Sequence, residues 1–422
     1  MTENQENKTV DSSISADEKS VKFGGSILDL VQGADVEWKV LGEVIISLNT
    51  GLNPRKFFQL NTPNSKNYYV TIREIHDGKI VFSEKTDKMN DEALRLCNNR
   101  SNLEKGDILF SGTGTIGETV VLTETPTNWN IKEGVYTIKP KQDIILSKFL
   151  MYLLRSDDIR QAYLKKAAGG TVKSVPMKEL KNIKIPIPSL EIQQKVVEIL
   201  DKMTDYVTEL TAELTAELTL RQKQYAYYRD KLLTFPSQSD SDESLGVEWR
   251  VLGEICEIKR GKRLVKNELE EVGKYPVYQN SMTPLGYYHQ FNFDGDNTFI
   301  ICAGAAGEIG YMSENFWAAD DVSVLTVPSN LMSRYLYHFL LTKQNSIKSK
   351  VRRASVPRLS KISFENIKIP VPTLSEQKRI VEILDSFDKL TSNLTDGLPH
   401  EIKLRKKQYE YWREQLLSFK RE

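Results

Sequence analysis

The sequence predicts an α+β protein with an internal repeat, in which two mixed, strand-rich domains are separated by two long, paired helices. The segment from Ile183 to Phe235 returns from Ile367 to Phe419, 184 positions later. Within the first copy, apolar residues recur in steps of three and four, as at Leu200, Met203 and Val207. That spacing is typical of a long helix whose apolar face packs on another helix. Segments rich in β-branched and aromatic residues lie between the helices and give the α+β class.

Length and composition exclude several classes of protein. With 422 residues the chain is too long for one compact core, so two or more domains are expected. The formal net charge of +1 gives no global basic character, so any nucleic-acid binding must depend on local patches. Three cysteines and four histidines are scattered without the spacing of a zinc site. No apolar run reaches the ~20 residues of a membrane helix and no signal peptide is visible, so we expect a cytoplasmic protein.

The repeat and the local composition predict the order of the parts along the chain. Residues 1–24 are polar and nearly free of large apolar side chains, so we expect a disordered tail. Both repeats open with a similar phrase, VEWKVLGE at residues 36–43 and VEWRVLGE at residues 247–254. The full order is a tail (1–24), a strand-rich domain (25–188), a long helix (189–235), a polar linker (236–245), a second strand-rich domain (246–372) and a second helix (373–419).

Each strand-rich domain is expected to follow the same plan of strands, a glycine-rich turn and a helix. The first should contain strands at 67–75 and 79–83, a strand, glycine-rich turn and strand at 106–124, a strand at 134–140 and a helix at 147–166. Asp77-Gly78 is a favoured turn pair between the first two strands. The second should contain strands at 275–281, 297–314 and 321–328 and a helix at 331–350. A basic loop with the triplet Ser-Val-Pro follows each helix, at 171–180 and 351–360.

Two short motifs are similar to cofactor-binding sequences but lack their context. Phe110-Ser-Gly-Thr-Gly114 is similar to the F-x-G-x-G turn of methyltransferases that use S-adenosylmethionine. The chain lacks the tetrapeptide (D/N/S)-P-P-(Y/F/W) that holds a flipped base, so a tight turn between strands is favoured. Residues 169–174 are similar to a phosphate-binding loop, but Val172 replaces a required glycine. We predict no catalytic residues and no metal site; a bifunctional DNA methyltransferase is the alternative.

Clusters of lysine and arginine recur in both strand-rich domains and could neutralise DNA phosphates. The candidates are Lys165, Lys166, Lys173 and Lys178 in the first domain, and Arg260, Lys262, Arg263, Arg352, Arg353 and Arg358 in the second. Polar residues on nearby turns could read base edges: Ser111, Thr113, Gln279, Asn280 and Ser281. A solvated surface is the alternative for each cation, and a turn-forming role is the alternative for each polar residue.

The ends of the long helices carry more aromatic surface than a contact between two helices needs. Aromatic residues of this kind often anchor a partner protein. The aromatic residues at the helix ends are Tyr225, Tyr227, Tyr228, Tyr409, Tyr411 and Trp412. Of these, the candidate partner-binding residues are Tyr225, Tyr228, Tyr409 and Trp412. Because both helices belong to one chain, pairing within the chain is favoured over the alternative of dimerisation. A coiled-coil adaptor that does not bind DNA is a further alternative for the whole protein.

Together, these segments resemble the DNA-specificity subunit of type I restriction-modification systems. The resemblance rests on the paired segments IPIPSLEIQQKVVEILD and IPVPTLSEQKRIVEILD, the helix ends KQYAYYR and KQYEYWR, and the two VEW phrases, and it covers residues 26–419. It implies two target-recognition domains that each read one half of a split DNA site. It also implies that the two long helices pack as an antiparallel coiled coil between them.

The resemblance further implies the partners and cofactors. The ligand would be double-stranded DNA, and two modification subunits would bind the scaffold and methylate adenine with S-adenosylmethionine. Two motor-nuclease subunits would complete the restriction complex, and ATP and Mg²⁺ would belong to the partner subunits. The chain itself would hold no cofactor and contact no membrane.

In this family, tandem Thr-Ala-Glu-Leu repeats set the gap between the half-sites, and the chain has two, at 211–214 and 215–218. The proposed spacer residues are Leu210, Leu214 and Leu218, which succeed one another in steps of four. Four helical residues rotate the second domain by ~40° beyond a full turn, close to the twist of one base pair. The second long helix instead carries Gly397 and Pro399, which should interrupt it, with Pro399 at the first position of a new helix.

Overall fold

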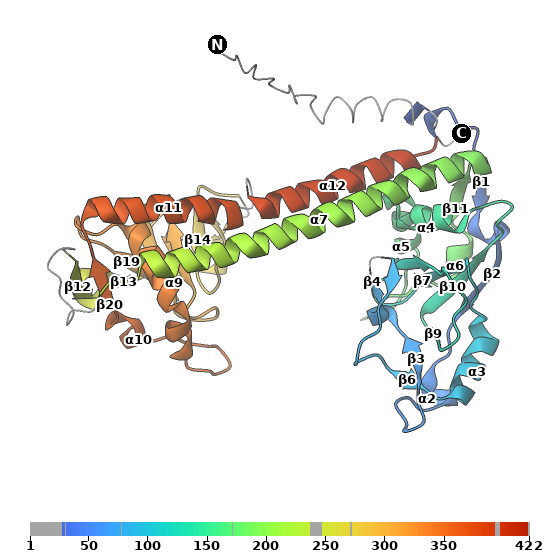
Figure 1. The fold of residues 1–422 in the computed structure, drawn as a ribbon, viewed down its shortest axis with the longest axis horizontal. Helices are drawn as coiled ribbons and strands as arrows, with labels where there is room; N and C mark the ends of the chain where they lie inside the picture. The colour runs from blue at the N-terminus through green and yellow to red at the C-terminus, as the bar shows by residue number, and fades with distance from the viewer. Residues whose placement is uncertain are drawn as a thin grey trace, which may run out of the picture. The chain divides into compact units, whose positions relative to one another are not determined.

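The computed structural model describes residues 28–420 except residues 30, 77, 171, 237–246, 271 and 393–396. The expected tail and all but the first residue of the expected linker lie outside the described residues. The chain divides into two compact units: unit 1 contains residues 1–210 and 405–422, and unit 2 contains residues 211–404. Each unit combines a strand-rich domain with parts of the long helices (Figure 1).

A four-stranded antiparallel sheet forms the centre of unit 1. Its strands are ordered β2 (Ile45–Thr50), β10 (Val135–Pro140), β7 (Ile108–Ser111) and β8 (Thr119–Val121). The strands predicted at 106–124 and 134–140 are confirmed, with the glycine-rich turn between β7 and β8. Both faces of β7 are buried, because Phe110 packs in the core with helix α4 (Ser147–Arg155) and Leu109 packs with the residues of a smaller sheet.

The smaller sheet of unit 1 contains β6 (Lys88–Met89), β3 (Asn67–Val70) and β9 (Trp129–Ile131), next to helix α3 (Asp91–Ser101). The strand predicted at 67–75 is wrong beyond Val70, because Ile72–Glu74 form a short 3-10 helix. Thr71 and Glu74 form a capping box, in which Thr71 N donates to Glu74 Oε2 at 2.8 Å, so the backbone turns away from the sheet. The predicted turn at Gly78 is confirmed between two short strands, β4 (Ile75–His76) and β5 (Lys79–Ile80).

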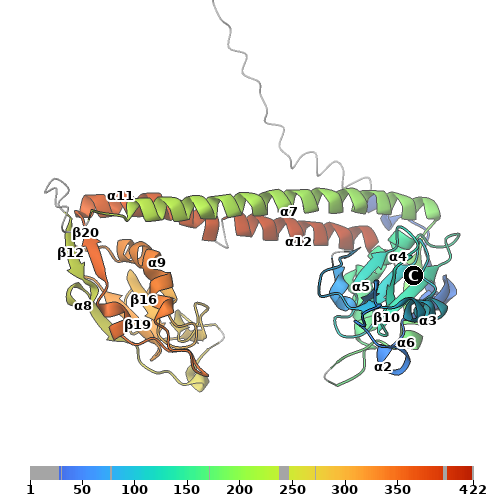
Figure 2. The ribbon, with the colours of Figure 1, turned by 60° about the horizontal axis from the view of Figure 1, so that its bottom comes forward.

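Unit 2 repeats this architecture with different side chains. Its central sheet has the order β13 (Glu257–Arg260), β19 (Val322–Thr326), β16 (Asn297–Ile301) and β17 (Ile309–Met312). Its smaller sheet has the order β15 (Gly286–Tyr288), β14 (Tyr275–Tyr278) and β18 (Trp317–Ala318). Helix α9 (Ser333–Ser349) packs on β16 and β17 (Figure 2). The strand order matches that of unit 1, which confirms the predicted internal repeat.

Two-stranded sheets join the beginning of each strand-rich domain to its end. They pair β1 (Glu37–Val40) with β11 (Lys184–Ile187), and β12 (Glu248–Val251) with β20 (Lys368–Val371). The tryptophan of each VEW phrase also holds the chain that comes after a long helix. Trp38 Nε1 donates to Lys420 O at 3.1 Å, and Trp249 Nε1 donates to Pro236 O at 3.0 Å. The VEW phrase therefore fastens a helix end to its unit.

The helix predicted at 147–166 is interrupted in unit 1, where α4 ends at Arg155 and α5 (Asp157–Leu164) begins after Ser156. Ser156 has extended backbone angles, and its hydroxyl donates to Leu153 O at 2.7 Å. Asp157 and Asp158 then stabilise the start of α5 through their charge near its N-terminus. In unit 2 the corresponding helix, α9, is continuous, as predicted.

The first long helix is α7 (Leu190–Leu232), which includes both Thr-Ala-Glu-Leu repeats without a break (Figure 1). The second is divided into α11 (Leu374–Ser392) and α12 (Leu398–Leu417), which confirms the predicted interruption. Pro399 takes the second position of α12 rather than the predicted first. The short helices include η1 (Leu41–Glu43), α2 (Pro54–Phe57), α6 (Met177–Lys181), α8 (Leu252–Ile255), η4 (Lys266–Glu268) and α10 (Ile362–Glu365).

Antiparallel packing of the long helices occurs inside each unit. In unit 1, α7 and α12 meet where the hydroxyls of Thr204 and Tyr409 lie 2.8 Å apart, and Leu200, earlier on α7, shares a core with Leu416, later on α12. In unit 2, the later part of α7 packs on α11: Tyr228 stacks on Phe387, and α7 and α11 residues share a core. Each strand-rich domain thus packs against the beginning of one long helix and the end of the other.

A buried glutamine fixes the beginning of each long helix to its strand-rich domain. The Gln193 and Gln377 side chains are fully buried, and each makes three hydrogen bonds to backbone groups at 2.8–3.0 Å. The partners are Leu146 N, Ile144 O and Pro188 O for Gln193, and Met332 N, Asn330 O and Pro372 O for Gln377.

A buried polar network joins three helices of unit 2. The fully buried His338 on α9 has its Nε2 2.7 Å from Asp385 Oδ1 on α11. Its Nδ1 lies 3.1 Å from the hydroxyl of Tyr225 on α7. Arg334 donates to Asp385 and to Asp388, both at 2.7 Å. Burial lowers the pKa of His338 despite the bond to Asp385, so a neutral imidazole donates to Asp385 and accepts from Tyr225.

Unit 2 should lose stability as the pH falls below about 6.5, the ordinary pKa of histidine. The unfolded chain then takes up a proton that buried His338 does not accept, which costs at most about 1.4 kcal/mol per pH unit. Asp385 stays ionised there because, although burial opposes it, hydrogen bonds from His338 and Arg334 lower its pKa. Chemical unfolding between pH 7 and pH 5 checks this: His338→Gln should show a weaker pH dependence, and an unchanged dependence would contradict the assignment.

Candidate nucleic-acid interface

The glycine-rich turn and the basic loop of unit 1 are joined by hydrogen bonds. Gly114 N donates to Lys173 O at 3.0 Å, and the hydroxyls of Thr113 and Ser174 lie 3.0 Å apart. The loop is also closed on itself, because the backbones of Ala168 and Ser174 exchange two hydrogen bonds of 2.8 Å. The fold therefore places the basic loop directly against the turn between β7 and β8.

Unit 2 has the same arrangement and adds a third segment to it. Gly304 N, in the turn between β16 and β17, donates to Pro357 O at 3.1 Å. The next residue, Ala305, donates from its N to Asn280 O at 2.9 Å. Gly304 has φ +77°, and a Cβ there would lie 2.6 Å from Asn280 O, so only glycine allows this approach. Three segments that the sequence marked separately are thus in contact.

The Ser-Val-Pro triplets of the two loops do not occupy equivalent positions. In unit 1, Ser174 pairs with the glycine-rich turn, whereas in unit 2 Arg358 does so. The next residues along the two loops agree with this pairing. Val175 N donates to the oxygen of the first residue after β7, and Leu359 N donates to the oxygen of the first residue after β16. Ser174 therefore corresponds to Arg358 rather than to the serine of the second triplet, because backbone pairing sets the equivalence.

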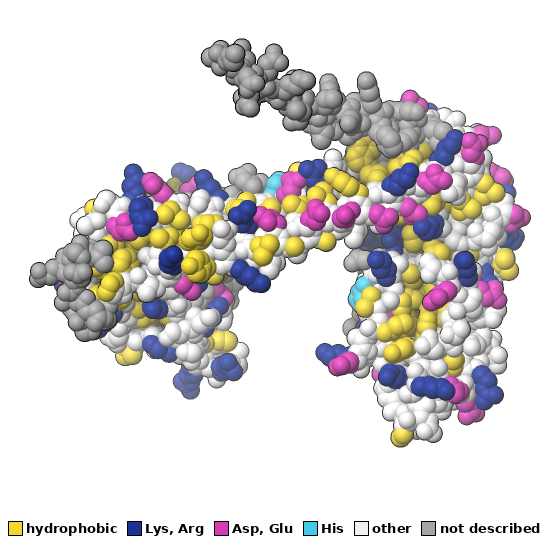
Figure 3. All heavy atoms as spheres, in the orientation of Figure 1, with side chains coloured by type: hydrophobic (Ala, Val, Ile, Leu, Met, Phe, Trp, Pro, Cys, Tyr) yellow, Lys and Arg dark blue, Asp and Glu magenta, His cyan; other side chains and the backbone are white. Residues whose placement is uncertain are grey.

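All ten candidate cations are exposed: Lys165, Lys166, Lys173, Lys178, Arg260, Lys262, Arg263, Arg352, Arg353 and Arg358. Weak ion pairs hold two of them, since Lys166 lies 3.7 Å from Glu179 and Arg260 lies 4.0 Å from Asp321. On the face shown in Figure 3, lysines and arginines alternate with carboxylates and form no single basic stripe. Because the formal net charge of the chain is only +1, local clusters of cations are the groups that could neutralise DNA phosphates.

The five polar candidates differ in their accessibility. Ser111 is fully buried, and its hydroxyl donates to Thr115 O at 2.6 Å and accepts from Glu118 N at 2.8 Å. Its side chain therefore holds the turn and cannot reach DNA, which corrects its place among the candidates. Ser281 also serves a turn, because its hydroxyl donates to Thr283 O at 2.7 Å. Thr113, Gln279 and Ser281 are half-buried, and Asn280 is exposed.

The segment from Phe110 to Gly114 has the surroundings of a structural turn. It connects antiparallel strands, and the fully buried Phe110 packs on Tyr136 and Tyr163. A Cβ at Gly112 would lie 2.2 Å from the ring of Tyr136. The glycine is thus required by packing against a tyrosine, without any need for a cofactor.

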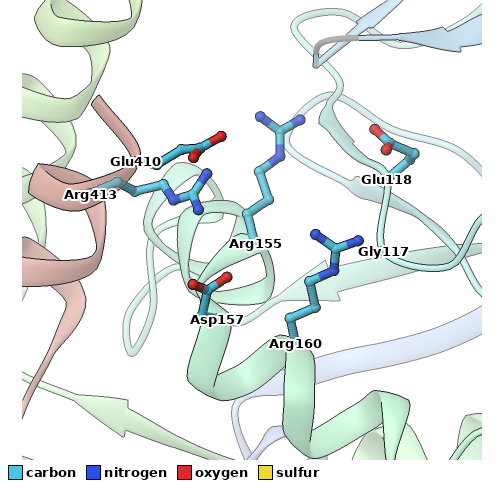
Figure 4. Close-up of a pocket in the computed structure, with 7 residues that line it drawn as sticks. All are labelled: Gly117, Glu118, Arg155, Asp157, Arg160, Glu410 and Arg413. Atoms are coloured by element: carbon cyan, nitrogen blue, oxygen red, sulfur yellow. The ribbon is translucent and has the colours of Figure 1, made fainter. Parts of the chain in front are cut away.

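A polar pocket of about 520 Å³ lies in unit 1 beside the junction of α4 and α5 (Figure 4). Figure 4 shows that Glu410 and Arg413 reach it from one helix, α12, while the other side chains come from the strand-rich domain. Its charged side chains are Arg155, Arg160 and Arg413, and Glu118, Asp157 and Glu410. Three cations face three carboxylates, so the pocket has no net charge to select an anion.

A second pocket, of about 250 Å³, joins Arg260 to Arg358 in unit 2. Ser323, Ser360 and Lys361 also line it. None of these three residues was a sequence candidate, although Ser360 is the last residue of the basic loop at 351–360. The antiparallel pairing of β13 with β19 places Ser323 opposite Arg260, a relation that only the folded sheet reveals.

No metal-like cluster of three histidine, cysteine, aspartate or glutamate side chains occurs within the part of the chain that the structure describes. In that part, every helix is also too short or too polar to cross a bilayer. The three cysteines are free thiols; Cys97 and Cys256 are buried and Cys302 is half-buried.

The four candidate partner-binding aromatics are Tyr225, Tyr228, Tyr409 and Trp412, and all four have contacts inside their own units. Other residues of the same helices are more exposed. Leu220 and Tyr227 on α7 are 61% and 59% exposed, and Leu404 and Tyr411 on α12 are 47% and 58% exposed. The two pairs occupy equivalent positions of the repeat, so the same apolar face is exposed twice.

Comparison with known proteins gives consistent matches along nearly the whole chain. The family described as "Type I restriction modification DNA specificity domain" matches residues 34–220 and 245–404. A putative type I restriction enzyme specificity subunit of Haemophilus influenzae is 29% identical over 420 residues, which are 92% of this chain and 97% of that protein. The EcoprrI specificity subunit of Escherichia coli is 30% identical over 380 residues, 87% of this chain and 91% of that one. A solved structure from work on assembly and conformational transition of the type I R-M system shares the fold, with TM-score 0.64, 19% identity, and coverage of 90% and 97%.

Proposed function

Because the chain belongs to the family of type I restriction-modification DNA specificity domains, we propose that it directs such a complex to a bipartite DNA site. It would be the non-catalytic subunit, in which each unit recognises one half of the site. One observation carries this proposal: the same backbone scaffold presents two loop surfaces with different side chains. Equal scaffolds explain how both halves are held in the same way, and different loops explain how two different sequences are read.

Selection from random DNA tests this function. The chain, assembled with its modification subunit, is mixed with random duplexes, and the bound duplexes are sequenced at rising salt. A motif of two unlike halves separated by a spacer of constant length is expected. Enrichment of no sequence would support a coiled-coil adaptor instead, and DNA methylation by the chain alone would support the methyltransferase alternative.

We also propose that two modification subunits bind one chain, together with two restriction subunits. Leu220 and Tyr227 lie seven residues apart on α7, which puts them on one face of the helix, and Leu404 and Tyr411 repeat this on α12. An apolar face that is exposed twice in the same form fits a partner that binds twice in the same way.

Tyr227→Ala and Tyr411→Ala should each weaken the binding of one modification subunit, and the double variant should weaken both, because each tyrosine anchors one copy. Native mass spectrometry of the complex counts the copies. Tyr287→Ala, which removes an exposed tyrosine from a strand of unit 2, is the control. If the double variant still binds two modification subunits, this apolar face is not where they bind.

We propose the cofactors from membership of this family. S-adenosylmethionine would be bound by the modification subunits, and ATP and Mg²⁺ by the restriction subunits, so that this chain itself would hold no cofactor. The cytoplasm, where the target DNA is found, is the compartment that we propose.

The Thr-Ala-Glu-Leu repeats are proposed as the spacer of the molecule. Leu210, Leu214 and Leu218 are half-buried along α7. The boundary between the two units falls between Leu210 and Thr211, at the start of the repeats. The Thr215 hydroxyl donates to Thr211 O at 2.6 Å, so the repeats satisfy their polar side chains within the helix. A helical segment of this kind can change in length without disturbing either core.

A further inference from the structure

We infer that the pocket between Arg260 and Arg358 binds a single phosphate of the DNA backbone and so fixes the register of the half-site that unit 2 reads. This inference rests on the proposed DNA-binding function and adds a defined site to it. The equivalent space in unit 1 is occupied by a tyrosine side chain.

Two arginines from distant parts of the chain form the pocket. Arg260 ends β13, and its Nε donates to the backbone oxygen of Asp320, which holds the side chain in place while 66% of it stays exposed. Arg358 lies at the end of the closed basic loop, where its backbone pairs with Arg352. Within the described residues, the exposed guanidinium of Arg358 has no hydrogen-bond or ion-pair partner. One arginine is thus oriented, and the other is free to bind.

The charge and the donors of the pocket suit a phosphate. Among the described residues that line it, the cations are Arg260, Arg358 and Lys361, and the one carboxylate is that of Asp321. Lys361 is 3.9 Å from Glu365 and remains largely exposed. The hydroxyls of Ser323 and Ser360 are further donors. Guanidinium groups bind phosphate oxygens through paired, charge-assisted hydrogen bonds. The excess of cations distinguishes this pocket from the balanced one in unit 1.

The size and the position of the pocket favour a phosphate within DNA. Its volume of about 250 Å³ is below the about 300–1,000 Å³ of pockets that enclose whole small molecules. Arg358 adjoins Pro357, whose oxygen is bonded to Gly304 of the turn that also contacts Asn280. A phosphate held between the two arginines would therefore lie beside the residues that are candidates for reading bases. Free inorganic phosphate has the same chemistry, and it is a separate arm of the test.

In unit 1 the same space is filled by a tyrosine. Strand pairing makes Tyr136 equivalent to Ser323. Tyr136 lies opposite Phe110 on β7, and Ser323 lies opposite Ile300 on β16. Phe110 and Ile300 are equivalent, because each is the last but one residue of its strand before the glycine-rich turn. The ring of Tyr136 packs on Gly112, and its hydroxyl donates to Val175 O at 2.8 Å. In unit 2 the residue equivalent to Gly112 is Cys302, next to Ser323 at 3.2 Å. Small side chains thus leave the pocket open in unit 2.

The test uses the full chain assembled with its modification subunit and duplexes that contain the selected motif. Each duplex carries one neutral methylphosphonate in place of one phosphate, at successive positions of the two half-sites. In the wild type, one position in the half-site of unit 2 should weaken binding about tenfold. Arg358→Ala should weaken binding by a similar factor, lower the salt dependence by about one ion, and lose sensitivity to that position.

A second variant and a control complete the experiment. The double substitution Cys302→Gly and Ser323→Tyr introduces into unit 2 the glycine and tyrosine that fill this space in unit 1. It should reduce DNA binding and the sensitivity to the methylphosphonate as Arg358→Ala does, although it keeps every cation. Arg250→Ala, an arginine of β12 that is paired with Glu248 at 3.1 Å, should bind as the wild type. If both pocket variants keep the wild-type pattern, the inference is overturned. Saturable binding of inorganic phosphate without a sensitive DNA position would also overturn it, and absence of any selective binding would overturn the proposed function itself.

Discussion

Insertion of a third Thr-Ala-Glu-Leu after Leu218 is expected to lengthen the spacer of the recognised site by about one base pair and to leave both half-sites unchanged. Four added residues extend α7 by about 6 Å and rotate the helix beyond the insertion by about 40° more than a full turn. One base pair rotates the DNA by about 34–36°. The added length of about 6 Å corresponds to between one and two base pairs at about 3.4 Å each, so length alone does not choose between them. The added rotation is close to the twist of one base pair, so we expect the spacer to grow by one.

The measurement is the mapping of methylated adenines in DNA from cells that express each variant with its modification subunit. Deletion of one repeat should shorten the spacer by the same amount. A matched control keeps the length: Thr215→Ala removes a methyl group and a hydroxyl that bonds within the helix, at 2.6 Å from Thr211 O, and adds no residue. An unchanged spacer in the insertion variant, or changed half-sites with a constant spacer, would contradict the role of the repeats.

Replacement of Gln193 by alanine should destabilise unit 1 by about 3 kcal/mol, and Gln377→Ala should do the same in unit 2. Each substitution leaves buried backbone groups without partners, and each such group costs about 1–3 kcal/mol. The fully buried glutamines hold the chain before α4 or α9 to the first turn of α7 or α11. Their loss should therefore release the beginning of a long helix from its strand-rich domain.

Hydrogen exchange resolved by mass spectrometry measures this effect for each unit separately. Gln193→Ala should increase exchange in α4 and in the first turns of α7 while unit 2 keeps its protection. The neighbouring Gln194 is exposed, and its side chain bonds among the described residues only to Glu198, at 3.0 Å, so Gln194→Ala is the control and should change stability by less than about 0.5 kcal/mol. Equal effects of the two substitutions would show that the buried bonds are unimportant.

Much of the fold could be predicted because the repeated segments and the spacing of apolar residues along the helices are visible in the sequence itself. The long helices and the interruption before Pro399 are expected from apolar spacing and from the geometry of proline. The predicted strand beyond Val70 failed because Thr71 and Glu74 bond with each other and stop it, and the predicted helix at 147–166 failed at Ser156. In both places a short polar side chain competed successfully with the regular backbone pattern.

The candidate interface could be predicted in composition but not in geometry. The sequence was enough to select the lysines and arginines that are exposed. The pairing of Arg358 with the glycine-rich turn was not predictable, because it depends on backbone hydrogen bonds between distant segments. Ser111 was misjudged because a serine beside a glycine looks the same in sequence whether it is buried or exposed. The difference between Tyr136 and Ser323, which closes one pocket and opens the other, becomes visible only when the strands are paired.

Methylation-sensitive sequencing of the host genome, with and without the gene, shows whether this chain supplies the DNA sequence specificity of a type I complex. A methylated-adenine motif with two unlike halves and a constant spacer is expected in the presence of the gene and should be lost without it. Methylation that is identical in both strains, or a single undivided motif, would show that the chain does not supply this specificity.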